Sequence, residues 1–268
     1  MEIREGDITT DAQEIIRKYQ PATVIHLASV MSGEGEANMD KAMQVNLQGT
    51  LKLLEACREV GTCPKFLFAS SIAAFGGASE VTEASAALPT TTYGTTKACA
   101  ELLVADFGRK WFVDARTARL PTVIIRPGPP NLAATGCFSA VPKAVLGGYA
   151  ITAPLPHDKT HPVISVTNAI AGLKRTHCLA REDVGGRPIT LPALNVSLGH
   201  LVEVCSAEAE KRNIVPGRVS YQPDLETERI VGAMPGTIIE GARAQQLGLP
   251  RDESLRDVVL DYLADVPS

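Results

Sequence analysis

The sequence lacks a long apolar run and a cluster of basic residues. No uninterrupted apolar stretch reaches the roughly 18 residues that a membrane-spanning helix requires. The 26 lysines and arginines are outnumbered by 30 aspartates and glutamates, which gives a net charge of −4 at pH 7 and no basic footprint for a phosphate backbone. We therefore expect neither a membrane nor a nucleic acid as a partner of this chain.

A secretory signal is also missing, because residues 1–20 have neither a basic start nor an apolar centre. We therefore expect a cytoplasmic protein. The 268 residues are 45% hydrophobic and 21% charged, a composition that excludes disorder as the main state and predicts a folded chain with a sizeable core.

The cysteines and histidines form no disulfide or metal pattern. His157 and His161 are four residues apart, a spacing that would place two metal ligands on one face of a helix. Three prolines around them oppose a helix, so we predict an irregular loop and no metal site. The scattered cysteines, without a C-x-x-C pair, are expected to be free thiols. They are Cys57, Cys63, Cys99, Cys137, Cys178 and Cys205.

Apolar strand patterns alternate with helical patterns up to about residue 190. The expected strands are Ala22 to Ala28, Lys65 to Ala69, Val123 to Arg126 and Ile189 to Leu191. The expected helices are Asp11 to Tyr19, Met39 to Val60 with Gly61 as its C-cap, Tyr93 to Lys110 and Ile164 to Leu179. Continuously apolar strands separated by helices predict an α/β fold with a doubly wound parallel sheet, in the manner of a truncated Rossmann fold.

The pattern changes to helices and polar loops beyond Leu194. Ser197 is expected to cap a helix from about Leu198 to Arg212, and a last helix is expected near Ser254 to Ala264. We therefore predict a nucleotide-binding and catalytic domain at residues 1–194. A small, mostly helical lobe on the substrate side, residues 195–268, is expected to pack on it.

Three polar residues suggest chemistry at one end of the sheet. Ser71 follows the strand at Lys65 to Ala69, and Tyr93 and Lys97 are four residues apart on the next helix, so they share a face. The lysine charge favours the phenolate and should lower the pKa of Tyr93, which then serves as a general acid or base. A serine after a strand and a Tyr-x-x-x-Lys spacing each occur often by chance. The prediction of a catalytic site therefore depends on their occurring together.

These residues make the chain resemble the extended short-chain dehydrogenase/reductase family, which includes the NAD-dependent epimerases and dehydratases. Placing Phe75-Gly76 at the end of the family's serine motif selects Ser71 over Ser70. The matching segments are Gly6 to Asp11, His26 to Ser29, Asn46 to Thr50, Ser70 to Gly76 and Leu120 to Gly128.

The resemblance implies a site and a cofactor. Ser71, Tyr93 and Lys97 would be the catalytic residues, and the cofactor would be NAD, with NADP left open. Its contacts would come from Asp7, Ile8, Leu27, Ala28, Tyr93, Lys97 and Pro121. Three matched residues could instead have structural roles. His26 could be a core histidine, Asn46 could link a helix to a loop through its amide, and Asp7 could be a turn or cap residue.

Within the family, the likeness is to D-erythronate dehydrogenases, which implies oxidation of a hydroxy acid or sugar acid such as D-erythronate. The resembling stretches are Ser32 to Ala37, Arg119 to Asn131, Glu228 to Val231 and Pro235-Gly236. The substrate contacts would be Ser71, Tyr93, Arg126 and Arg229, since an arginine grips a carboxylate with two parallel hydrogen bonds. The alternative is that both arginines form structural ion pairs.

The family's Gly-x-x-Gly-x-x-Gly turn, which holds the cofactor pyrophosphate, has no counterpart here. We therefore expect NAD binding to be weak or lost. Two alternatives stay open: a pseudoenzyme or binding module without dinucleotide binding, and a fragment of a longer gene product. The resemblance also implies a homodimer through the helices at residues 39–60 and 93–110.

Overall fold

A four-stranded parallel sheet lies at the centre of the protein. The computed structural model describes residues 2–129 and 133–265. The strands follow the order β1-β2-β4-β8, and all neighbouring pairs are parallel. Their bounds are β1 (Thr23–His26), β2 (Lys65–Ser71), β4 (Asp114–Leu120) and β8 (Ile189–Thr190). The predicted α/β class is confirmed.

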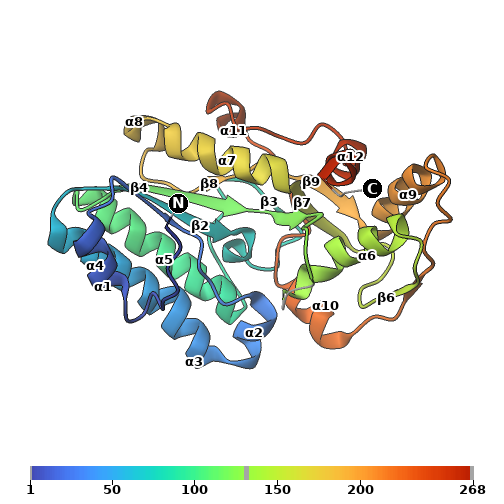
Figure 1. Ribbon diagram of the computed structural model, residues 1–268, viewed down its shortest axis with the longest axis horizontal. Helices are drawn as coiled ribbons and strands as arrows, with labels where there is room; N and C mark the ends of the chain where they lie inside the picture. The colour runs from blue at the N-terminus through green and yellow to red at the C-terminus, as the bar shows by residue number, and fades with distance from the viewer. Residues whose placement is uncertain (1, 130–132, 266–268) are drawn as a thin grey trace.

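Helices cover both faces of this sheet (Figure 1). On one face lie α1 (Ala12–Tyr19), α4 (Gly49–Val60) and α5 (Thr92–Arg109), and on the other lies α7 (Val166–Cys178). Leu54, Phe66 and Val104 belong to the core under α4 and α5, while Ala118 and Ile189 belong to the core under α7. Burial on both faces explains the uninterrupted apolar run in β2, whereas β1 is covered less completely, since Ile25 is 54% exposed.

The helix expected at residues 39–60 contains a change of geometry. It consists of α3 (Met39–Ala42), a π-helical segment (Met43–Gln48) and α4, and it ends at Gly61 in the left-handed region at φ 73°. Single π-helical turns inside α-helices often occur at functional sites. Here the turn contains Asn46, one of the residues in the family likeness.

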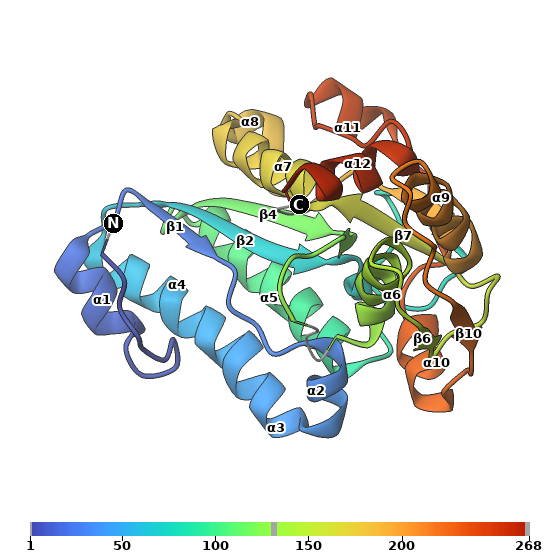
Figure 2. The same ribbon diagram turned by 45° about the vertical axis from the view of Figure 1, so that its right-hand side comes forward.

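A second lobe surrounds a smaller sheet of β5 (Thr122–Ile124), β7 (Thr160–Ser165) and β9 (Leu194–Ser197). Figure 2 shows α6 (Cys137–Leu146), α9 (Leu198–Glu210) and α12 (Leu255–Asp265) gathered around it. Its core contains Phe138, Leu201 and Val258, so segments on both sides of residue 194 share one core. The domain boundary at residue 194 stays a prediction.

The remaining elements are short. They are α2 (Ser32–Ala37), α8 (Arg181–Val184), α10 (Leu225–Gly232), α11 (Ala242–Gln246), the 3₁₀ turns Ile72–Phe75 and Ala134–Gly136, and two parallel pairs, β6 (Ile151–Ala153) with β10 (Val219–Tyr221) and β3 (Glu80–Val81) with β11 (Thr237–Ile238).

Several strands escaped the sequence prediction, and β4 and β7 are the longest of them. β4 carries Asp114, Arg116 and Arg119 in a central position, and β7 begins at Thr160, where an irregular loop was expected. The loop prediction is therefore wrong for His161, which is fully buried and lies 2.8 Å from the Thr122 hydroxyl. Among the described residues, no group of histidine, cysteine and carboxylate side chains is arranged to hold a metal ion.

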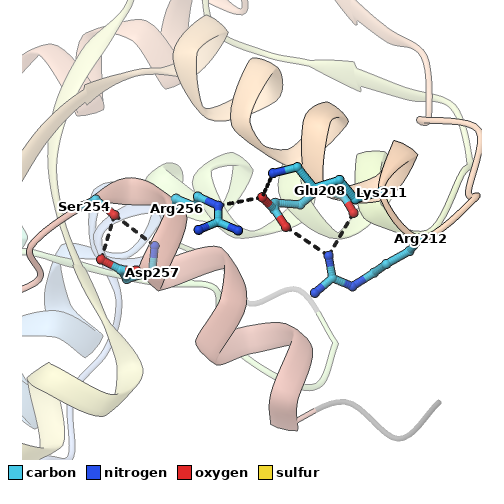
Figure 3. Close-up of polar contacts among 6 residues, drawn as sticks. All are labelled: Glu208, Lys211, Arg212, Ser254, Arg256 and Asp257. Atoms are coloured by element: carbon cyan, nitrogen blue, oxygen red, sulfur yellow. Dashed lines mark hydrogen bonds and ion pairs between the residues drawn. The ribbon is translucent and has the colours of Figure 1, made fainter.

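A cluster of ion pairs ties α12 to α9 (Figure 3). The Glu208 side chain is 3% exposed and accepts hydrogen bonds from Lys211 at 2.6 Å, Arg256 at 2.8 Å and Arg212 at 3.0 Å. Across the described part of the chain, no helix combines the length and hydropathy needed to cross a bilayer.

Candidate active site

The first turn of α5 places Tyr93 beside the end of β2. Thr91 caps the helix, since its hydroxyl accepts a hydrogen bond from the Gly94 backbone N–H at 3.0 Å. A Cβ atom at Gly94 would overlap the Ala73 carbonyl oxygen, so glycine allows the helix to press against the 3₁₀ turn that follows Ser71. The close approach brings Tyr93 to Ser71.

The two adjacent serines have different partners. The Ser71 side chain lies close enough to the Tyr93 phenol to lower its pKa, and its hydroxyl oxygen accepts from the Ala73 N–H at 3.2 Å. The Ser70 hydroxyl instead donates to Glu101 at 2.5 Å. The structure therefore brings Ser71, and not Ser70, to the phenol.

Lys97 lies beneath the phenol ring of Tyr93. Its side chain is 3% exposed, its Nζ donates to the Ala69 carbonyl at 2.9 Å, and the Nζ lies 5.6 Å from the Tyr93 ring centroid. Burial lowers the pKa of Lys97 to about 8, against the opposing effect of the Glu101 charge. At neutral pH, Lys97 is therefore mostly a buried ammonium.

The pKa of Tyr93 is shifted in the direction opposite to the one predicted from the sequence. Burial raises this pKa, and the neighbouring Ser71 hydroxyl acts in the opposite direction. Desolvation penalises the charged phenolate, so it outweighs the effect expected from a neighbouring cation. Tyr93 is thus a protonated phenol in this state of the protein.

Asn46 and His26 form hydrogen bonds that join β1 and the loop after it to the helix at residues 43–60. The Asn46 amide pairs with both backbone groups of Val30, accepting from its N–H at 2.7 Å and donating to its carbonyl at 3.1 Å. It therefore ties the π-helical turn to the loop after β1. His26 bonds to the Thr50 hydroxyl at 2.8 Å, and burial lowers its pKa to about 4, so it is a neutral core histidine.

The residues expected to contact a cofactor fall in two places. Leu27 and Ala28, both exposed, follow β1, and the buried Pro121 follows β4, so they share the carboxyl edge of the sheet with Ser71. Asp7 instead lies exposed in the turn before α1, and Ile8 lies against α4. Asp7 accepts the Thr9 N–H at 2.7 Å, and Ile8 packs against Gly49.

The two arginines that were expected to bind a substrate carboxylate differ in their acidic partners. Arg126 is half-buried, burial lowers its pKa, and none of the described carboxylates pairs with it. Arg229 lies 2.9 Å from Glu36, whose other oxygen accepts the Thr92 N–H at 2.7 Å. Arg229 therefore already has an acidic partner. Pro130 and Asn131, the end of the stretch that includes Arg126, lie outside the described residues.

Sequence reasoning missed the buried pair beneath this site. Glu101 accepts two hydrogen bonds from Arg119, at 2.8 and 2.6 Å, and both side chains are almost fully buried. The available signal was the position of Glu101 four residues after Lys97, on the same face of α5.

Comparison with known proteins agrees with this geometry. Residues 1–152 match the family described as NAD dependent epimerase/dehydratase. The D-erythronate dehydrogenase of Cupriavidus necator is 38% identical over 245 residues, which cover 90% of this chain and 75% of that protein. The D-erythronate dehydrogenase of Haemophilus influenzae is 30% identical over 260 residues, which cover 95% of this chain and 80% of that protein.

A solved structure is similar over almost the whole chain. The nucleoside-diphosphate-sugar epimerase from Agrobacterium tumefaciens superposes with a TM-score of 0.88 at 30% identity, covering 98% of this chain and 78% of that one. The family likeness inferred from the motifs is confirmed. This chain belongs to the NAD-dependent epimerase/dehydratase family.

Proposed function

We propose that this chain is an NAD-dependent oxidoreductase that oxidises a hydroxy acid or sugar acid, with D-erythronate as the first substrate to test. The observation that carries the proposal is the Ser71 and Tyr93 hydroxyl pair above the buried Lys97 ammonium, at the carboxyl edge of a parallel sheet. The names of two similar proteins suggest the substrate.

The residues at this edge fit a nicotinamide cofactor. Among the described residues, the Ala69 carbonyl is the one hydrogen-bond acceptor of Lys97, so its other N–H groups are available to ribose hydroxyls. Leu27 and Ala28 are exposed residues directly after β1, where a cofactor crosses the edge of such sheets. NAD, when bound, supplies the carbon that accepts a hydride.

The chain's own residues position the substrate and move a proton. The Ser71 hydroxyl holds the oxygen of the substrate's reacting alcohol, and Tyr93, in its phenolate form, accepts the alcohol's proton as the carbonyl forms. Burial keeps Tyr93 protonated, so its action as a base depends on the Ser71 hydroxyl and on the Lys97 charge. Both favour the phenolate.

Replacing the phenol tests the proposed mechanism. Purified protein with NAD and D-erythronate should produce reduced nicotinamide, followed by its absorbance. Tyr93→Phe should lower kcat by about 10²- to 10⁴-fold, because it removes the group that exchanges the proton. Tyr149→Phe, on the exposed Tyr149, is the matched control and should retain activity. Turnover that persists in Tyr93→Phe would contradict the mechanism.

Calorimetric titration with NAD separates this proposal from the binding-module alternative. The weak or lost NAD affinity expected from the sequence stays a prediction, and the same titration measures it. Saturable binding together with D-erythronate oxidation supports the oxidoreductase. Absence of both NAD binding and turnover would favour a module that binds a small acid or another chain.

We also propose a homodimer, as the family likeness implies, through α3 and α4 (with the π-helical turn between them) and α5. Two large apolar side chains on these helices lie open to solvent: Met39 on α3 is 60% exposed and Leu102 on α5 is 72% exposed. Exposed apolar residues on long helices favour helix packing with a second copy.

A further inference from the structure

A buried acid next to the candidate site takes no part in the chemistry described above. Glu101 is 4% exposed and lies one helical turn after Lys97 on α5. Its carboxylate is saturated by three short hydrogen bonds, two from the Arg119 guanidinium at 2.8 and 2.6 Å and one from the Ser70 hydroxyl at 2.5 Å. The two parallel bonds from arginine hold the carboxylate in one orientation.

The three members of this network come from the elements that build the site. Ser70 is on β2, Glu101 is on α5 and Arg119 is on β4. Ser70 immediately precedes Ser71, and Lys97 donates to the carbonyl of Ala69 on the same strand. The contacts of Lys97 and Glu101 therefore hold two consecutive residues, Ala69 and Ser70, against α5 immediately before Ser71.

A buried ion pair is weak evidence for stability, because removing two charges from water offsets their attraction. A hydrophobic pair at the same positions would avoid that cost. A carboxylate at this place nevertheless has an electrostatic consequence, since it lies on the same helix face as the Lys97 ammonium, which is itself removed from water.

The charged and titratable groups around Lys97 are few. Glu101 on α5 is the acid that acts on it, and His26 on β1 is neutral at pH 7. Tyr93 on α5 is a protonated phenol, and β2 places the Phe68 ring and the Ala69 carbonyl, both uncharged, beside the ammonium. From β4, Arg119 faces Glu101, which neutralises its charge. Among the described residues, Glu101 is therefore the acid whose charge acts on the ammonium, and the paired Arg119 offsets part of that effect.

We propose that Glu101, held by Arg119 and Ser70, is a positioning residue that keeps Lys97 in its ammonium form and fixes the end of β2 where Ser71 meets Tyr93. This inference rests on the proposed function, in which the Lys97 charge favours the Tyr93 phenolate. It predicts an effect of Glu101 on the protonation of Lys97 as well as on the stability of the fold.

NMR titration of Lys97 tests, without any catalytic assay, whether Glu101 keeps Lys97 in its ammonium form. In protein with labelled lysine side chains, the Lys97 signal is identified by its loss in Lys97→Arg. Glu101→Gln should lower the pKa of Lys97 by about one unit, since it removes the opposite charge. Asp106→Asn is the matched control on the same helix, because Asp106 pairs with Arg109 at the surface, and it should leave the Lys97 titration unchanged.

The pH profile of kcat with D-erythronate is the catalytic readout. The activity requires the ammonium, so its high-pH limb should move to lower pH in Glu101→Gln by the shift seen in the Lys97 titration. Because Glu101→Gln leaves the Arg119 charge unpaired, the double variant Glu101→Gln with Arg119→Met removes both charges; it should still lower the Lys97 pKa, but by less than Glu101→Gln alone, since the Arg119 cation is gone as well.

The outcomes separate the two proposals. A folded Glu101→Gln or double variant that melts at lower temperature, with an unchanged Lys97 titration and pH profile, would show a purely structural pair and overturn the inference. Wild-type protein that binds NAD but turns over no acid would overturn the proposed function, while the NMR titration would still decide the role of Glu101.

Discussion

Arg126 is a half-buried guanidinium without an acidic partner among the described residues, whereas Arg229 pairs with Glu36 at 2.9 Å. A guanidinium that has lost part of its hydration without gaining a carboxylate is suited to bind an anionic substrate group. At the scale of single residues, Arg126 is therefore the better candidate for holding the carboxylate of a sugar acid.

Arg126→Ala is expected to raise KM for D-erythronate by about 10- to 100-fold with a smaller effect on kcat. The loss of charge-assisted hydrogen bonds, about 1.5–3 kcal/mol, corresponds to that factor. Steady-state kinetics measures KM for D-erythronate and for its uncharged amide. Arg126→Ala should leave KM for the amide unchanged. Arg218→Ala, on an exposed arginine, is the control. An equal rise in KM for the amide would argue against a carboxylate contact.

At the same scale, the spacing of Tyr93 and Lys97 predicted their shared helix face correctly, and the structure adds the reason for the distinction between the serines. Neighbouring side chains on a strand point in different directions, so Ser70 reaches Glu101 while Ser71 reaches Tyr93. The raised pKa of Tyr93 could not be predicted, because it depends on burial by several elements.

At the scale of elements, helix ends were predictable because their signals are local. Ser197 caps α9 by accepting the His200 N–H at 3.1 Å, and Gly61 ends α4, both as expected. β4 was missed because its sequence, DARTARL, contains three charged residues. Its arginines are buried only because partners from other elements, Glu101 and the Leu179 carbonyl, accept their hydrogen bonds.

The contact between α9 and α12 leads to a prediction on pH and stability. Hydrogen bonds from Lys211, Arg256 and Arg212 lower the pKa of Glu208 to about 2 from an ordinary value of 4.5. The carboxylate therefore stabilises the fold fully above about pH 4.5, and this contribution is lost as the pH falls toward 2. Glu208→Gln should lower the Tm at pH 7 by a few degrees.

Thermal unfolding of wild type and Glu208→Gln at several pH values measures the effect, and the difference in Tm should shrink as the pH falls below 4.5. Glu203→Gln is the matched control, because the Glu203 side chain is 70% exposed and lies 3.4 Å from the exposed His200. A Tm difference that is independent of pH would refute the role assigned to the Glu208 carboxylate.

At the scale of the whole molecule, the proposed homodimer predicts a change in mass on substitution of one exposed side chain. Wild-type protein at micromolar concentration should sediment as a dimer, and Leu102→Glu should shift it to the monomer, because a charge would be buried in the interface. Leu88→Glu, at a residue that is 70% exposed outside these helices, should leave the dimer intact. A monomeric wild type would contradict the proposal.

The sequence by itself determined the alternation of strands and helices, the shared face of Tyr93 and Lys97 and the family, because periodicity, caps and motif spacing act over a few residues. The tertiary structure alone decided that Ser70 binds Glu101, that Arg229 pairs with Glu36, and that Arg119 and Glu101 form a buried pair beneath Lys97. Those contacts join residues from different elements, and their strength depends on burial, which exists only once the elements have packed.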